Sequence, residues 1–340
     1  MRSCIILFQK KILPALIVIL ISLVSVSCGG GGGGGGGDEL VSNTNNINVN
    51  AGRLPQDIVT LQTRFTSVFL ADVDNDNDND LILGGFAGDA PGTMNKSDRD
   101  RLLLNNGSGV FAEAPSDAMP IRVGGAAWGV IDIRSGDLNG DGFNDIVTAV
   151  VDNGYTQASL QLMLNDGTGH FVDATDQLIS PASTYGDNFL STGSVQIIDM
   201  DGDGIMDVVS RNYIFMNSGS AVFTEHLLPA FPDDIFPTYA CGHLNGDSKG
   251  DCFGYGGNGL TFYMNTTTVP GPPTFETVLP TMSQNFTLVT VLDLVLIDYD
   301  SDGDLDLVAL GLSDELNATW SIENNGDGTF VQDDSQAERV

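Results

Sequence analysis

The chain has 340 residues, of which 41% are hydrophobic, so it has enough apolar side chains for one large folded domain or two ordinary ones. Its 13 basic residues face 45 acidic ones, which gives a formal net charge of −32. Because a phosphate backbone requires a basic surface, we expect no nucleic-acid partner. Such an excess of carboxylates indicates a solvated acidic face, a bound cation, or both.

The first 27 residues have the pattern of an export signal. Arg2, Lys10 and Lys11 precede an apolar run over residues 12–26, and this run ends just before Cys28. A charged segment followed by a short apolar one is typical of a signal peptide rather than of a stable membrane span.

This segment resembles the signal of bacterial lipoproteins, in which the cysteine is lipidated and becomes the new N-terminus. The family motif prefers Leu three residues before the cysteine, where this chain has Ser25. By resemblance to enterobacterial sorting rules, Gly29 after Cys28 favours the outer membrane. We therefore expect a signal peptide over 1–27, lipidation of Cys28, a membrane partner through that anchor, and a place in the cell envelope. The alternatives are a soluble secreted protein cleaved near Ser27 and an uncleaved anchor.

Residues 28–56 are predicted to be a tether. Nine glycines occupy 29–37, and an Asn-rich polar stretch follows. A Gly-rich chain of this length has a root-mean-square reach of about 30 Å. The folded domain is then expected over 57–340, with an extra strand over 57–62 that is able to pair into the last repeat.

A short acidic loop recurs five times in the folded region, and its first positions are 65, 62, 44 and 55 residues apart. Internal repetition of this kind is typical of propellers and solenoids. Each loop is counted here from position 1 to position 9: loop 1 (Asp72 to Asp80), loop 2 (Asp137 to Asp145), loop 3 (Asp199 to Asp207), loop 4 (His243 to Asp251) and loop 5 (Asp298 to Asp306).

A second motif follows each loop, and it consists of an apolar run, an Asn/Gly turn and a Phe. It is clear at 104–111, 164–171, 215–223 and 322–330, whereas in the fourth repeat only 263–265 remains, with Phe275 as the closing residue. Asn-Gly and Asp-Gly between apolar runs predict hairpins. Two hairpins per repeat give four strands, so we predict an all-β fold, a β-propeller of four-stranded blades with five repeats visible.

The loops have the composition of calcium sites. Carboxylates at positions 1, 3, 5 and 9 place several hard oxygens around one point, and Ca²⁺ prefers six to eight oxygen ligands. The predicted ligands are Asp72, Asp74, Asp76 and Asp80 in loop 1; Asp137, Asn139, Asp141 and Asp145 in loop 2; Asp199, Asp201, Asp203 and Asp207 in loop 3; and Asp298, Asp300, Asp302 and Asp306 in loop 5.

An EF-hand is excluded as the source of these sites. It needs Glu at position 12 and flanking helices, whereas these loops have strands beside them and other residues there: Leu83, Thr148, Ser210, Gly254 and Ala309. Loop 4 differs from the rest, because His243 is a poor ligand for a hard cation and Lys249 adds positive charge. We expect loop 4 to bind metal weakly or not at all, and four to five Ca²⁺ ions in the chain.

The two motifs together, D-x-[DN]-x-D-G-x-x-D-[LIV] followed by N-x-G-x-G-x-F, resemble the FG-GAP and VCBS repeats over residues 64–330. These are the calcium-loop blades of integrin α-subunit propellers and of many bacterial surface proteins. The resemblance implies a β-propeller with calcium in its loops and recognition on one face. Integrin relatives usually have seven blades, so this chain is a smaller ring, contains degenerate blades, or is completed by a partner.

Cys241 and Cys252 flank loop 4, where other repeats have apolar pairs such as Leu70 and Leu81. Such positions are expected to face each other across a hairpin base. Outside the cytoplasm we predict a disulfide there; the alternative is a pair of buried free thiols.

No catalytic constellation is visible in the sequence. His170 and His243 lie inside repeat motifs, His226 is isolated, and neither zinc spacing nor a nucleophile elbow occurs. Trp128 and Trp320 are expected to pack in the blades rather than to stack on sugars. We therefore expect a non-enzymatic binding or adhesion module for a carbohydrate or protein ligand. The alternatives are a polysaccharide-active lyase or hydrolase on a propeller scaffold, and a structural subunit of the envelope.

Overall fold

A computed structural model describes the folded region with several gaps. The described residues are 11–13, 16–18, 53–55, 65–85, 100–125, 128–152, 157–179, 195–210, 213–227, 238–256, 259–268, 273–281, 290–313 and 316–333. The predicted lipidation site Cys28, most of the tether and the predicted strand at 57–62 lie outside them. Within the predicted signal segment, β1 (Lys11–Leu13) pairs with β2 (Leu16–Val18). In the part described, no helix is both long and apolar enough to cross a membrane.

Five four-stranded antiparallel sheets account for the folded part of the described chain, and in each sheet the strands follow one another in sequence order. Sheet 1 contains β3 (Phe65–Ala71), β4 (Asp80–Gly85), β5 (Arg101–Asn105) and β6 (Phe111–Glu113). Sheet 2 contains β7 (Trp128–Gly136), β8 (Asp145–Asp152), β9 (Ala158–Asn165) and β10 (Phe171–Asp173). Sheet 3 contains β11 (Val195–Ile198), β12 (Asp207–Ser210), β13 (Tyr213–Asn217) and β14 (Phe223–Leu227). Sheet 4 contains β15 (Thr238–Gly242), β16 (Asp251–Gly256), β17 (Gly259–Asn265) and β18 (Phe275–Val278). Sheet 5 contains β19 (Thr290–Ile297), β20 (Asp306–Ser313), β21 (Leu316–Asn324) and β22 (Phe330–Asp333). One helical turn, α2 (Thr175–Leu178), follows sheet 2.

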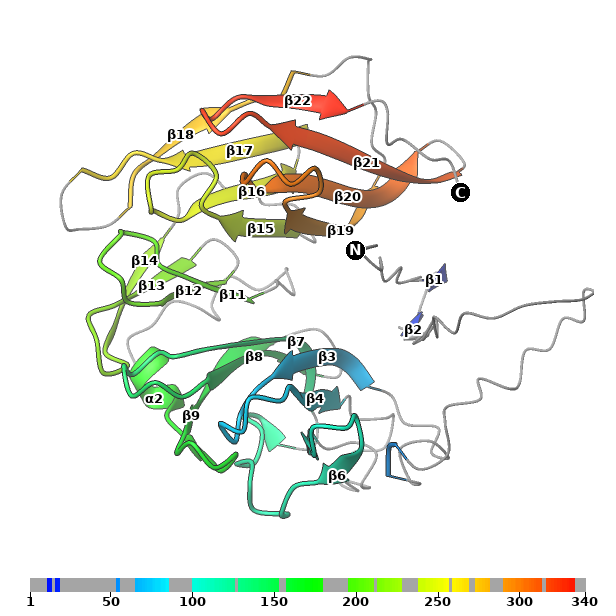
Figure 1. The fold of residues 1–340 in the computed structure, drawn as a ribbon, viewed down its shortest axis with the longest axis vertical. Coiled ribbons are helices and arrows are strands. Elements are labelled where there is room, and N and C mark those ends of the chain that lie inside the picture. Colours follow the sequence, from blue (N-terminus) through cyan, green and yellow to red (C-terminus); the bar gives the residue numbers. More distant parts are fainter. Residues whose placement is uncertain are drawn as a thin grey trace, which may run out of the picture.

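The sheets follow one another around an arc, with sheet 1 at one end and sheet 5 at the other (Figure 1). The first strand of each sheet contacts the first strand of the next, in the order β3, β7, β11, β15 and β19. This is the arrangement of propeller blades, and the predicted all-β fold of four-stranded blades is confirmed.

Both motifs of the repeat lie where the sequence predicts hairpins. The nine-residue loop joins the first two strands, so that position 9 pairs with the residue before position 1, as Asp207 does with Ile198. The Asn/Gly turn joins the last two strands, so that its Asn pairs with its Phe, as Asn217 does with Phe223. The degenerate fourth repeat keeps this register, and Phe275 pairs with Asn265.

The core consists of four apolar clusters, each between two neighbouring sheets. Alternation along the second strand of each sheet explains them, because successive side chains point to opposite faces. The first residue after position 9 faces the preceding sheet and the second faces the following one. The resulting pairs are Ile82 with Ile146, Val147 with Val208, Val209 with Cys252, and Phe253 with Leu307, all 1% exposed or less.

Candidate metal centres in the hairpin loops

Three of the five loops bring carboxylate oxygens together. In loops 1, 3 and 5 a set of three oxygens lies within 4.8 Å of one another, which is close enough to hold one metal ion. The sets are Asp72, Asp74 and Asp80 in loop 1; Asp199, Asp201 and Asp203 in loop 3; and Asp298, Asp300 and Asp302 in loop 5. Of the predicted ligands in these three loops, Asp76, Asp207 and Asp306 stand outside the sets.

The donor chemistry of these sets fits a hard cation. Oxygens are the ligands that Ca²⁺ prefers, and carboxylates this close repel one another without one. No Lys, Arg or His in the described residues forms an ion pair with them. In loop 1, burial and then the charges of neighbouring aspartates raise the pKa of Asp74. Its buried Oδ1 also has no hydrogen-bond partner among the described residues.

Loop 2 has the same shape with one neutral donor. Asn139 takes position 3, and its Oδ1 accepts the backbone N–H of Asp141 at 2.9 Å. Its Nδ2 donates to Asp141 Oδ2 at 2.8 Å. Asn139 and Asp141 are therefore adjacent, and Asp137 is partly buried whereas Asp141 is exposed.

The aspartate at position 1 fixes the turn of each acidic loop. In loop 3 the two oxygens of Asp199 accept the backbone N–H groups of Gly202 and Gly204, both at 2.8 Å. Positions 4 and 6 both have positive φ, at 81° and 86° in this loop. Loop 1 places Asn75 and Asn77 at these positions, with φ of 60° and 69°. Asn tolerates this region better than other non-glycine residues, so the loop forms without Gly.

The aspartate at position 9 is a buried structural residue in every loop. Asp207 is 1% exposed; its Oδ2 accepts the N–H of Met200 at 2.8 Å, and its Oδ1 accepts the N–H of Asn217 at 2.6 Å. Burial raises the pKa of Asp207 to about 7, although these backbone hydrogen bonds oppose the rise. The same cause raises the pKa of Asp145 and Asp251 to about 6.

An asparagine at the end of the third strand ties each loop to the next sheet, a role that sequence reasoning missed. We call these residues the strand-end asparagines: Asn105, Asn165, Asn217, Asn265 and Asn324. In sheets 2 to 5 the side-chain Nδ2 donates to the backbone C=O at position 2 of the preceding loop. The acceptors are Val73, Leu138, Met200 and Leu244, at 2.8, 2.7, 2.5 and 2.8 Å. The signal was present in the sequence, because this Asn occurs in all five repeats, including the degenerate one.

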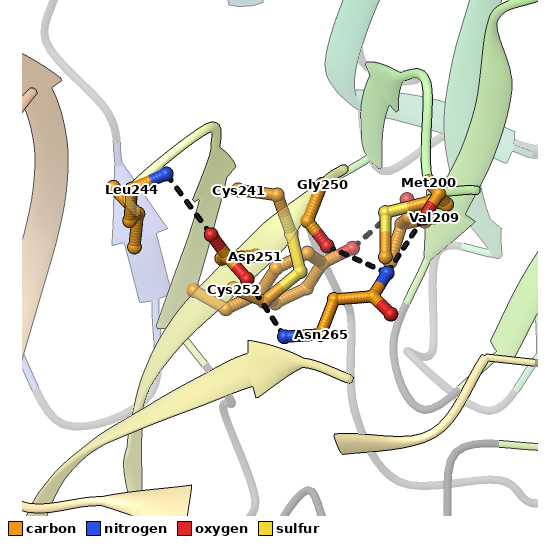
Figure 2. The surroundings of a disulfide bond; sticks show 9 residues. Met200, Val209, Cys241, Leu244, Gly250, Asp251, Cys252 and Asn265 are labelled. Atoms are coloured by element: carbon orange, nitrogen blue, oxygen red, sulfur yellow. Dashed lines mark hydrogen bonds between the residues drawn. A yellow bond between two sulfur atoms is a disulfide. The ribbon is translucent and has the colours of Figure 1, made fainter. Parts of the chain in front are cut away.

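Loop 4 has lost the acidic cluster but keeps the structural bonds. Asp251 accepts from Leu244 and Asn265, and Asn265 donates to Met200 of loop 3 and to Gly250, as Figure 2 shows. A disulfide joins Cys241 and Cys252 at the base of the hairpin. His243 replaces the position-1 aspartate.

A lysine side chain supplies positive charge inside loop 4. Lys249 Nζ lies 3.9 Å from Asp247 Oδ2. Its aliphatic stem lies beside Gly202 of loop 3, where an added Cβ would lie 3.4 Å from Lys249 Cγ. An ammonium group therefore lies beside the position-5 carboxylate of loop 4; weak metal binding in this loop stays a prediction.

The residues considered for catalysis have structural surroundings. Trp128 packs against the cluster between sheets 1 and 2. His170 and Asp166 share an exposed hairpin turn, with Nδ1 4.0 Å from a carboxylate oxygen. Beside Trp128, the buried Arg122, which sequence reasoning missed, donates to Asp100 and to the backbone C=O of Trp128. The side chain of Trp320 is not among those that the structure describes.

Comparison with known families identifies the repeat. The FG-GAP-like repeat family matches residues 137–210, from position 1 of loop 2 to the end of β12. Residues 137–210 are an FG-GAP-like repeat. The loops, registers and strand-end asparagines of the other sheets follow the same pattern, so the chain is an FG-GAP repeat protein.

Three known proteins are similar to this chain. Integrin alpha-4 of Xenopus laevis is 25% identical over 158 residues, which are 46% of this chain and 14% of the integrin. The structure of a lectin from Agrocybe aegerita, described as recognising non-reducing terminal N-acetylglucosamine, superposes with a TM-score of 0.52 at 20% identity. That match covers 80% of this chain and 65% of the lectin, and it shows the fold alone. A putative exo-β-1,3-galactanase from Bifidobacterium bifidum S17 matches at a TM-score of only 0.39 and 12% identity, over 79% of this chain and 91% of that enzyme.

Proposed function

We propose that this protein is a calcium-binding β-propeller, held at the cell envelope by a lipid anchor, that binds a carbohydrate or protein ligand. The observation that carries the proposal is the gathering of carboxylate oxygens in loops 1, 3 and 5. Bound Ca²⁺ would offset most of the charge of each set and hold the loops in one conformation. The proposed ligands within these sets are the nine aspartates named above, and Asp137, Asn139 and Asp141 form the equivalent set of loop 2.

The loops form one surface of the arc. All five join the first strand of a sheet to the second, and contacts connect loop 1 to loop 2 and loop 3 to loop 4. Asn144 of loop 2 donates to the C=O of Asp72 in loop 1 at 2.9 Å, and Gly250 of loop 4 lies against Asp199 and Met200 of loop 3. Within these two pairs, ordering one loop therefore supports its neighbour. The surface is acidic at loops 1, 2, 3 and 5 and is interrupted at loop 4 by Lys249. A ligand with hydroxyl groups or with basic side chains suits such a face.

Calcium binding is tested first by titration calorimetry of the full chain after removal of metal. We expect the chain to bind Ca²⁺. An Asp199→Asn variant should bind one ion fewer, because loop 3 loses its position-1 carboxylate. Asp117→Asn is the matched control, since Asp117 is exposed and lies outside the loops. Equal stoichiometry in the two variants would contradict the assignment of loop 3.

Ligand binding is tested by incubating the full chain with immobilised polysaccharides and with envelope extracts, in calcium and in EGTA. We expect retention that requires calcium and that Asp199→Asn weakens. Released reducing or unsaturated ends are measured in the same samples. Release that survives repurification would favour the second candidate, a polysaccharide-active lyase or hydrolase. If the protein is neither retained by a polysaccharide nor retained by an envelope extract, a structural envelope subunit is favoured.

The envelope location rests on the sequence of the leader, and it has its own test. Cys28→Ser should abolish incorporation of a clickable fatty acid and release the protein from the membrane fraction. Cys4→Ser is the matched control, because Cys4 lies in the segment that cleavage would remove. If Cys28→Ser stays at the membrane, the leader is an uncleaved anchor. If the unaltered chain appears in the medium, it is secreted.

A further inference from the structure

The four contacts between neighbouring sheets repeat one pattern, which defines a forward and a backward face for every sheet. The forward face includes position 2 of the loop, the residue before position 1, and the second residue after position 9. The backward face includes the first residue after position 9 and the strand-end asparagine. At the second residue after position 9, Ile82, Val147, Val209 and Phe253 are fully buried in the four forward faces that are covered.

The forward face of sheet 5 carries the same positions, but they are uncovered. Ile297 is 46% exposed and Val295 is 50% exposed, whereas the equivalent Ile198 and Ala240 are each 8% exposed. Val308, at the second residue after position 9, is only partly buried. An apolar half-interface therefore remains at this end of the arc.

The backward face of sheet 1 is uncovered in the complementary places. Leu70 is 54% exposed, and Leu81 is partly buried where the four equivalent residues are 1% exposed or less. Asn105 donates its Nδ2 only to Asn79 of its own loop, at 3.1 Å, within the part of the chain described. Leu103, the cross-strand partner of Leu81 on β5, is buried, so the uncovered part of this face is limited to β3 and β4 beside the loop.

We infer that the two end faces bind each other between copies of this chain, so that sheet 5 of one copy packs on sheet 1 of the next. The contact would continue the four internal interfaces: Ile297 and Val308 of one copy would cover Leu70 and Leu81 of the other. The amide of Asn105 would reach the C=O of Tyr299, which holds position 2 of loop 5. This pairing uses the same groups that join every other pair of sheets.

A second copy fits these faces better than the chain's own opposite end. Sheets 1 and 5 lie at opposite ends of the arc, and the buried interfaces and asparagine bonds fix each intervening sheet to its neighbour (Figure 1). Closure of one chain on itself would have to change those four interfaces. Because the contact joins two different faces, it is heterologous, and repeating it joins the copies head to tail.

The test is sedimentation velocity of the full chain in calcium, with a density-matched mild detergent, over a range of concentrations. We expect a mass that rises with concentration for the unaltered chain. Leu70→Lys and Ile297→Lys should each stay monomeric, since each variant lacks one of the two faces. Val172→Lys is the control, because Val172 is 60% exposed on β10, away from both ends, and this variant should assemble like the unaltered chain.

Mixing the two variants makes the test directional. Leu70→Lys keeps an unaltered sheet 5, and Ile297→Lys keeps an unaltered sheet 1. These two faces can bind each other, so an equimolar mixture should form a heterodimer and nothing larger. All variants share the same N-terminus, so association through an anchor would be equal in all of them. A monomeric unaltered chain, assembly of either single variant, or a mixture that stays monomeric would each overturn the inference.

Discussion

Replacing Asn217 by Ala tests whether the strand-end asparagines hold the sheets together. Asn217 is 3% exposed; its Nδ2 donates to Leu138 C=O of loop 2 at 2.7 Å and to Met206 C=O of its own loop at 2.9 Å. Its Oδ1 accepts the N–H of Gly219 at 3.0 Å. The substitution removes these three hydrogen bonds, but the C=O of Leu138 keeps a second donor, the N–H of Ala221 at 3.1 Å.

The magnitude follows from the number of orphaned groups. A buried polar group that loses its partner costs about 1–3 kcal/mol, and water entering the gap lowers this figure. With two groups orphaned and one bond lost from a carbonyl that keeps a donor, we expect Asn217→Ala to lower the free energy of unfolding by about 2–4 kcal/mol. That is a large share of the roughly 5–15 kcal/mol typical of a folded domain.

Urea denaturation followed by far-UV circular dichroism measures this loss, and Asn105→Ala is the matched control. Asn105 also makes one turn contact, as its Oδ1 accepts the N–H of Gly109 at 3.1 Å, and it donates to Asn79 of its own loop. It makes no bond to another sheet within the described residues. We expect its substitution to cost about 1 kcal/mol, because the groups it frees are more accessible to water. Equal losses in the two variants would refute the reasoning, since the bond between sheets would then contribute nothing.

Three further predictions concern the loops. His243→Asp combined with Lys249→Gly should restore metal binding in loop 4 and raise the calcium stoichiometry by one in calorimetry, whereas Lys249→Gly alone should add none. In EGTA the free energy of unfolding should fall as pH rises through about 6 to 7. Burial raises the folded pKa of Asp145, Asp207 and Asp251 above the unfolded value, so their protonated forms stabilise the fold. This stabilisation is lost as pH rises through the folded pKa values. In calcium the free energy of unfolding should instead rise with pH, since the ion favours the ionised carboxylates. Urea denaturation at several pH values, in EGTA and in calcium, measures both trends. A free energy of unfolding that rises with pH in EGTA would contradict the prediction. Reducing the Cys241–Cys252 disulfide, or replacing both cysteines by Ser, should lower the free energy of unfolding by about 3 kcal/mol or less without changing the calcium stoichiometry. Urea denaturation with and without reductant measures this loss. An unchanged midpoint would show that the disulfide adds no stability.

The repeat pattern is local, and for that reason much of the fold could be predicted from the sequence. Each loop lies between strands that are adjacent in the chain, and the hairpin register depends only on turn residues and strand alternation. The fourth repeat was the hardest case, yet Asn265 and Phe275 still identified its second hairpin. The number of four-stranded units therefore followed from counting two motifs.

The contacts between sheets could not be predicted in the same way. Asn165 reaches the C=O of Val73 across 92 residues of chain, and no local pattern specifies which carbonyl it meets. The left-handed position 4 was also missed, because loop 1 satisfies it with Asn75 and loop 5 with Ser301 rather than with Gly. The grouping of the carboxylates depends on side-chain orientation as well as spacing, which is why Asp80 joins its cluster while Asp207 and Asp306 do not.

Loop 4 separates the residues that build the fold from those that gather charge. It has lost the aspartate at position 1, and no acidic cluster forms among its described residues. Even so, Asp251 and Asn265 make the same four backbone bonds as their equivalents in loop 3. The pair at position 9 and the strand end therefore holds each hairpin to its neighbour whether or not the loop binds a cation. The carboxylates at positions 1, 3 and 5 are then free to vary from loop to loop, so that the metal content, and with it the surface offered to a ligand, can change without loss of the arc.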